Sequence, residues 1–136
     1  MAMLVIAGCL LVAAADAVRA SEPADAMRTI ILQQMDAFKR DDGAGAFAYA
    51  SPEIRAMFGT PEHFMQMVRR GYPQVYRPRE VTFRERVVFQ GKPALVVHIV
   101  GQDGSAVLAL YPMQRQPDGS WRIDGCYLLK TSDVGA

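Results

Sequence analysis

The hydrophobic positions in the first half of the chain repeat at the spacing of an α-helix. Over residues 24–40 the apolar side chains recur every three or four positions, at Met27, Ile30, Ile31, Met35 and Phe38. Such a stripe predicts a first helix with one buried face. After Asp41 and Asp42, either of which can cap a helix, a short second helix is predicted over residues 44–50.

Two further helix starts share one pattern. Ser51-Pro52-Glu53 and Thr60-Pro61-Glu62 each combine a capping hydroxyl, a proline at the first helical position and a carboxylate in the first turn. These features satisfy the free N–H groups at the start of a helix and complement its dipole. The helix after Thr60 is predicted to reach Arg70 and to stop at Gly71.

A period of two replaces the helical spacing after a connector over residues 72–78. It predicts four strands, over residues 80–90, 93–102, 105–116 and 120–130. The predicted turns are Gly91-Lys92, Asp103-Gly104 and Asp118-Gly119, and Asp-Gly is a pair that type I′ hairpins favour. Helices followed by a meander predict an α+β fold, in which the N-terminal helices pack on one face of a curved four-stranded antiparallel sheet.

Two-residue loops would decide which side chains share a face of that sheet. Counting outward from each turn places Glu85 opposite His98 and Val96 opposite Tyr111. One face then collects Val81, Phe83, Glu85, Val87, Phe89, Val96, His98, Val100, Val107, Tyr111, Asp124 and Cys126. We expect the helices to cover this face, because it alone is apolar on the first strand.

The opposite face of the predicted sheet is also largely apolar. Its first strand carries Thr82, Arg84 and Arg86, but the other strands contribute Val97, Ile99, Leu108, Leu110, Ile123 and Tyr127. An apolar face that no helix covers predicts a partner, and a second copy of the chain is the simplest one. The sequence therefore predicts a homodimer.

The N-terminus has the pattern of a signal peptide. Met3 to Ala15 form an apolar run of about a dozen residues, which is too short to cross a bilayer. Small residues in Ala17-Val18-Arg19-Ala20 predict cleavage before Ser21. The chain then divides into a signal peptide, residues 1–20, and one domain, residues 21–136, that is exported to the periplasm or secreted.

An alternative for the N-terminus is a lipid anchor. Ile6-Ala7-Gly8-Cys9 is similar to the site at which bacterial lipoproteins are modified, but the apolar run continues after Cys9. A soluble mature chain is therefore favoured over a lipoprotein or a retained anchor, and no membrane association is expected after cleavage.

Composition and charge bound the partners. With 51% hydrophobic residues, 21% charged residues and a net charge of +1, the chain has no basic excess that would favour nucleic acid. After cleavage Cys126 is the one remaining cysteine, which excludes an internal disulfide. Two histidines and one cysteine at unrelated positions do not form a metal site, and no cofactor motif is present. We expect no metal and no cofactor.

Glu85 and His98 form the strongest catalytic candidate. A carboxylate can orient an imidazole and raise its pKa, which would make His98 a general base in an apolar hollow. An ordinary cross-strand ion pair explains the same two residues. Tyr111 and Asp124 could add a polar lip to the hollow, but a hydrogen-bonded core hydroxyl and an edge carboxylate are the favoured interpretation of the two. Cys126 is expected to be a buried structural thiol. As ligand-binding residues we expect Phe83, Val96, His98 and Tyr111.

Several short segments carry a resemblance to a known family. They are Gln34-Met35-Asp36-Ala37-Phe38, Asp42 with Ala46-Phe47, Ala50-Ser51-Pro52, Phe64 with Met67-Val68, Tyr76-Arg77-Pro78, and Asp118 to Ile123 running into Gly125-Cys126. In these segments the chain, from about Met27 to Leu129, resembles the bacterial family called domain of unknown function 4864. The segment Asp118 to Ile123 is also similar to the last strand of many NTF2-like (cystatin-like) domains.

The resemblance implies an NTF2-like fold but no particular activity, because that superfamily contains isomerases, dehydratases and many non-catalytic binders. The hypothesis favoured by the sequence is an exported, non-catalytic domain that binds a small apolar or amphipathic molecule or a protein partner. The alternatives are an isomerase or hydro-lyase that uses Glu85 and His98, and a structural homodimer module.

Overall fold

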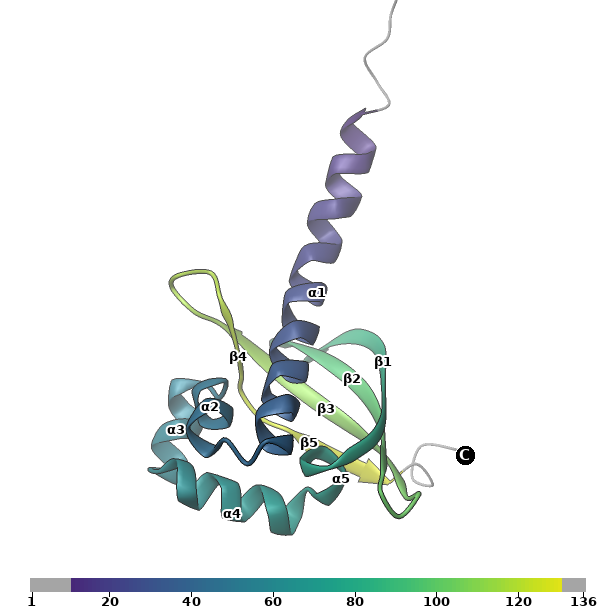
Figure 1. The fold of residues 1–136 in the computed structure, drawn as a ribbon. Helices are drawn as coiled ribbons and strands as arrows, with labels where there is room; N and C mark the ends of the chain where they lie inside the picture. The colour runs from purple at the N-terminus through teal and green to yellow at the C-terminus, as the bar shows by residue number, and fades with distance from the viewer. Residues whose placement is uncertain (1–10, 131–136) are drawn as a thin grey trace, which may run out of the picture.

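The computed structural model describes residues 11–130 and shows helices covering one face of an antiparallel sheet (Figure 1). Residues 1–10 lie outside the described part, and with them Cys9 and most of the apolar run predicted as the signal-peptide core. Residues 11–20, the remainder of the predicted signal peptide, form the first turns of the first helix. Among residues 11–130, no helix has both the length and the apolarity that crossing a bilayer requires.

The helices precede the strands in the chain, as predicted. They are α1 (Leu11–Lys39), α2 (Gly43–Ala48), α3 (Pro52–Phe58), α4 (Pro61–Gly71) and the short α5 (Pro73–Tyr76), which lies in the predicted connector. The predicted caps are confirmed: side chains of Asp42, Ser51 and Thr60 accept backbone N–H bonds at the starts of α2, α3 and α4. Asp42 rather than Asp41 caps α2.

The sheet has five strands instead of the four predicted. They are β1 (Pro78–Phe89), β2 (Lys92–Gly101), β3 (Ala106–Arg115), β4 (Trp121–Ile123) and β5 (Tyr127–Lys130), and all pairings between them are antiparallel. The predicted last strand is divided because Asp124-Gly125-Cys126 leaves the regular ladder. Its two parts, β4 and β5, both pair with β3.

The predicted register is wrong in the second hairpin because the loop has three residues. Gly101 pairs with Ser105 through a 2.8 Å bond, so Gln102, Asp103 and Gly104 form the loop. Gly104 has a φ of 83°, as expected in a type I turn followed by a left-handed residue. One extra loop residue shifts the pairing by one and turns every side chain of β2 to the other face relative to β3.

The first hairpin differs from the prediction in two ways. Its two-residue loop is Gln90-Gly91, whose φ values of 51° and 78° suit a type I′ turn. The pairing is also interrupted between Phe83 and Arg86, where β1 has a bulge. A bulge inserts an unpaired residue and bends the strand, so it changes which residues face each other on its two sides.

These two changes separate Glu85 from His98. His98 pairs with Thr82 on one side and with Leu108 on the other, whereas Glu85 lies in the bulge and is exposed. The predicted Glu85–His98 pair is therefore wrong. The prediction that the helices cover Val96, His98 and Val100 is wrong because the three-residue loop after Gly101 turns these side chains of β2 to the other face.

Helix α1 lies across one face of the sheet (Figure 1). The core lies between them, and on β2 it includes Leu95, Val97 and Ile99. The prediction is correct for Val107 and Tyr111 on β3 and for Val81 and Phe83 on β1, which pack against the core. It is wrong for Val87 and Phe89, because the bulge places them on the face of Ala94 and Val96. From the helices the buried side chains are Met27, Ile31, Met35, Ala37, Phe38, Ala46, Phe64, Met65, Val68 and Val75. The apolar stripe predicted for the first helix thus packs on the sheet.

Candidate functional site

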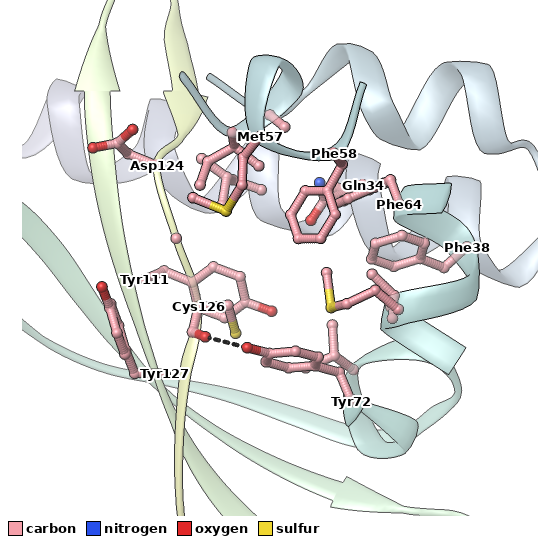
Figure 2. Close-up of a pocket in the computed structure, with 17 residues that line it drawn as sticks. Gln34, Phe38, Met57, Phe58, Phe64, Tyr72, Tyr111, Asp124, Cys126 and Tyr127 are labelled. Carbon is pink, nitrogen blue, oxygen red and sulfur yellow. Dashed lines mark hydrogen bonds between the residues drawn. The ribbon is translucent and has the colours of Figure 1, made fainter. Parts of the chain in front are cut away.

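A cavity of about 220 Å³ lies between the helices and the end of the sheet formed by β3 and the segment that joins β4 to β5 (Figure 2). Its lining comprises Gln34, Phe38, Ala50, Ile54, Met57, Phe58, Phe64, Met67, Val68, Tyr72, Val75, Tyr111, Ile123, Asp124, Gly125, Cys126 and Tyr127. Most of these side chains are aliphatic or aromatic. The exposed members are Met57, at 70%, and Tyr127, at 49%, so the cavity reaches solvent beside them.

The short helices position the aromatic wall of the cavity. Phe64 is buried and lies 6.0 Å from Phe38, 5.5 Å from Phe47 and 5.7 Å from Phe58, measured between ring centroids. These are ordinary separations for tilted and edge-to-face aromatic pairs. The cluster holds α2, α3 and α4 against the end of α1 and leaves the cavity on its inner side.

Tyr111 is the most distinctive polar residue of the cavity. Its side chain comes from β3, is 0% exposed, and has a hydroxyl with no hydrogen-bond partner among the described residues. In Figure 2 this hydroxyl points into the space between Phe58 and Tyr72. Burial raises the pKa of Tyr111 well above its usual value, and the nearby Cys126 raises it further. The neighbouring group is the Cys126 thiol, which is only a weak hydrogen-bonding partner. The hydroxyl is therefore neutral and has no nitrogen or oxygen partner among the described residues.

Tyr72 and Cys126 form the floor of the cavity. The Tyr72 hydroxyl donates a 2.9 Å hydrogen bond to the carbonyl oxygen of Cys126 (Figure 2), which fixes the segment between β4 and β5. Burial raises the pKa of the Cys126 thiol to about 12. Because the thiolate is the reactive form of cysteine, this thiol is poorly suited to act as a nucleophile near neutral pH.

The remaining polar side chains of the lining are held by other groups. Gln34 is buried and its Nε2 donates a 3.1 Å bond to the carbonyl oxygen of Ala46. Asp124 points away from the cavity in Figure 2. Its carboxylate accepts a 2.6 Å bond from the Ser51 hydroxyl and forms an ion pair with Lys92. Gln34 is uncharged, and the Asp124 carboxylate is paired outside the cavity, so neither residue brings a charge into the cavity interior.

The Ser51–Asp124 bond joins the start of α3 to the end of β4. Ser51 is 0% exposed, and its hydroxyl also accepts the N–H of Ile54 at 3.3 Å. The backbone N–H of Ser51 donates a 2.8 Å bond to the carbonyl oxygen of Ile123. These contacts hold α3, which supplies Ile54, Met57 and Phe58 to the cavity, against the sheet.

A second polar cluster lies outside the cavity, at the end of α1. Arg77 Nη2 contacts both carboxylate oxygens of Asp41 at 3.1 and 3.2 Å, and the Tyr76 hydroxyl donates to the same carboxylate. Hydrogen bonding from Tyr76 and from Arg77 lowers the pKa of Asp41, with Tyr76 contributing most. The cluster ties α5 to the end of α1 and thereby supports the cavity wall.

The residues predicted to bind a ligand do not come together. Tyr111 lines the cavity, but Phe83, Val96 and His98 do not. Phe83 packs against the core from β1, whereas Val96 and His98 are half-buried and share the sheet face opposite Leu95 and Val97. No group of three or more potential metal ligands occurs among residues 11–130.

Sequence reasoning missed most of the cavity because the helices supply it. Ile54, Phe58, Phe64 and Met67 each belong to a short helix whose apolar side chains are typical of ordinary core packing. The convergence of those helices on Tyr111 depends on tertiary contacts far apart in the chain. The segment Gly125-Cys126, which is part of the lining, did stand out in the sequence.

Comparison with known proteins gives one match. A family model described as a domain of unknown function (DUF4864) matches residues 20–136. No curated protein and no solved structure matches the chain.

Proposed function

We propose that this chain, which belongs to the DUF4864 family, is a non-catalytic domain that binds a small apolar or amphipathic molecule in the cavity between α3, α4 and β3. The observation that carries the proposal is an apolar cavity of about 220 Å³ with one unpaired hydroxyl inside it. Ligand sites are typically concave, largely apolar and equipped with a few polar groups that fix orientation. This cavity is likewise concave and largely apolar and contains one unpaired hydroxyl, but its volume is smaller than that of a typical ligand site.

A binding role is favoured over catalysis because the lining offers no acid–base pair. Among the described lining residues, Tyr111 and Cys126 are kept protonated by burial, and Asp124 is paired with Lys92. General acid–base catalysis requires a group that exchanges a proton near the working pH. The cavity chemistry therefore supports recognition of a molecule and not its conversion.

Binding of toluene to the mature chain tests this proposal. Amide signals of residues around Phe58, Phe64 and Tyr111 should shift in a saturable way in ¹H–¹⁵N NMR titrations. Met67→Trp replaces a flexible side chain of the lining by a bulky indole ring that fills part of the cavity, and it should abolish the shifts. Val88→Trp, which changes a residue that is 78% exposed and outside the lining, should retain them. Toluene shifts that are absent, or that survive Met67→Trp, would contradict the proposal.

Export to the periplasm or outside the cell is part of the same proposal. The geometry of α1 supports it, because Pro23 lies inside the helix Leu11–Lys39. A proline inside a helix removes a backbone hydrogen bond and is well tolerated only in the first turn. Cleavage before Ser21 would place Pro23 in the first turn of the mature helix. Intact-mass analysis of exported protein should give an N-terminus at or near Ser21, and a lipidated Cys9 or a retained Met1 would refute this.

The NTF2-like assignment is likewise proposed. It is supported by the arrangement of α1 across a bulged antiparallel sheet with a hollow at one end. Superposition of an experimental structure on NTF2-like domains would test it. A different strand order would overturn it.

A second candidate function is a homodimer module. The supporting observation is the sheet face away from α1, which carries Val96, Leu108 and Leu110 and includes Leu129 at 48% exposure. Sedimentation over micromolar to near-millimolar concentrations should show self-association, which Leu129→Lys should weaken. A chain that stays monomeric throughout would exclude this role.

A further inference from the structure

We propose that the ligand of the cavity is a neutral molecule with a single hydrogen-bonding group, and that this group binds the Tyr111 hydroxyl while the apolar remainder fills the space toward Met57. The inference rests on the proposed function, since it specifies what the same cavity binds. It depends on three observations: the volume of the cavity, the unpaired hydroxyl, and the charges of the lining.

The volume limits the enclosed part of the ligand to about the size of one ring with a short substituent. An engineered apolar cavity of about 150 Å³ binds benzene. By proportion, the 220 Å³ cavity holds about nine non-hydrogen atoms. Drug-sized ligands occupy sites of about 300 to 1,000 Å³. A long acyl chain or a nucleotide would therefore not be enclosed completely without movement of the helices.

The hydroxyl of Tyr111 supplies the polar contact. Buried hydroxyl groups nearly always have a hydrogen-bond partner, so one without a partner calls for a specific explanation. The hydroxyl of Tyr72, which also lines the cavity, is already bonded to the carbonyl oxygen of Cys126. Tyr111 therefore remains as the group that can donate to a carbonyl or ether oxygen of a ligand.

The lining disfavours a charged ligand. None of the residues that line the cavity in the described part of the chain is Lys, Arg or His, so a carboxylate or phosphate would have no counter-ion. Asp124 is the acidic member, and it is occupied by Ser51 and Lys92 at the edge of the cavity. Burial also raises the pKa of both Tyr111 and Cys126, which indicates an environment that penalises charge.

Three probes of nearly equal size, each of about nine non-hydrogen atoms, test the inference on the mature chain. Acetophenone has one carbonyl acceptor, cumene has no polar atom, and benzoate carries a charge. Each is titrated by NMR into the wild type, Tyr111→Phe and Tyr72→Phe. The Tyr72 variant is the matched control, because it removes a hydroxyl from the same cavity that is already bonded.

Acetophenone should bind the wild type at least tenfold more tightly than benzoate. Tyr111→Phe should weaken acetophenone binding by about threefold to tenfold, as expected for loss of one neutral hydrogen bond, and should leave cumene binding unchanged or tighter. Tyr72→Phe should change the affinities of acetophenone and cumene by equal factors. Thermal unfolding of each variant checks that the fold is intact.

Different results overturn different parts of the reasoning. If cumene binds and Tyr111→Phe does not lower the relative affinity for acetophenone, the assignment of the hydroxyl is wrong and the binding function stands. If benzoate binds as tightly as acetophenone, the neutral character of the ligand is wrong. If none of the probes binds the wild type, the proposed function fails and the inference fails with it.

Discussion

Replacement of Ser51 by alanine tests how the helix that lines the cavity is held in place. Ser51 is fully buried and makes two side-chain bonds, accepting from Ile54 N and donating to Asp124. Loss of a helix N-cap costs about 1 kcal/mol. Loss of a hydrogen bond to a charged acceptor adds about 1.5–3 kcal/mol when the acceptor stays buried. Because such terms are not strictly additive, we expect Ser51→Ala to lower the free energy of unfolding by about 2–4 kcal/mol.

Thr60→Ala provides the matched control. Thr60 caps α4 by the same type of bond, accepting from His63 N at 3.2 Å, but it is exposed and makes no other side-chain bond among the described residues. Its replacement should cost about 1 kcal/mol. The difference between the two variants therefore measures the contribution of the Asp124 contact. Urea unfolding followed by circular dichroism gives both values under the same conditions.

A double-mutant cycle with Asp124→Asn isolates the contact directly. The two single variants should be non-additive by about 1 kcal/mol or more, because Ser51 and Asp124 bond each other at 2.6 Å. Equal losses for Ser51→Ala and Thr60→Ala, together with additive behaviour in the cycle, would refute the reasoning. In that case α3 would be held by its apolar contacts and by the backbone bond to Ile123 alone.

Three further predictions concern the cavity side chains. Tyr111→Phe should leave the free energy of unfolding unchanged or raise it by up to about 1 kcal/mol. Tyr72→Phe should lower it by about 1 kcal/mol, because it removes a hydrogen bond. If urea titrations show that Tyr111→Phe lowers the free energy of unfolding more than Tyr72→Phe does, the Tyr111 hydroxyl is not unpaired. Because the Cys126 pKa rises from 9.0 to about 12 on folding, the contribution of Cys126 to stability should be constant below pH 9 and fall between pH 9 and 12; Cys126→Ala should reduce the slope in that range. A thiol reagent should modify Cys126 slowly in the native protein and rapidly after denaturation, and equal rates would show that the thiol is accessible.

The helices could be predicted from the sequence because their signals are local. The caps at Asp42, Ser51 and Thr60 act within three residues, and the stripe of α1 repeats within one helix. Gly45 illustrates a constraint that the sequence does not reveal. A Cβ at this position would lie 2.3 Å from a carboxylate oxygen of Asp42, so the capping geometry itself requires glycine there.

The faces of the sheet could not be predicted with the same certainty because Asp-Gly fits two kinds of loop. It can form the whole of a two-residue type I′ loop, or the last two positions of a three-residue loop. A signal for the longer loop is present in retrospect. In Asp103-Gly104-Ser105 and Asp118-Gly119-Ser120, the aspartate accepts bonds from the backbone and the hydroxyl of the serine. Gln90-Gly91 lacks that serine and forms the two-residue loop.

That single loop residue decides what chemistry the cavity contains. With the three-residue loop after Gly101, β2 turns Leu95, Val97 and Ile99 toward α1 and places His98 on the other face. A two-residue loop would have brought the imidazole to the helix-covered side of β2. Tyr111 faces the helices in both registers, because its orientation is fixed within β3 by alternation with its neighbours. The residue that remains at the cavity is therefore a neutral hydroxyl donor and not a base, which is why the structure favours recognition of a ligand by one hydrogen bond over acid–base catalysis.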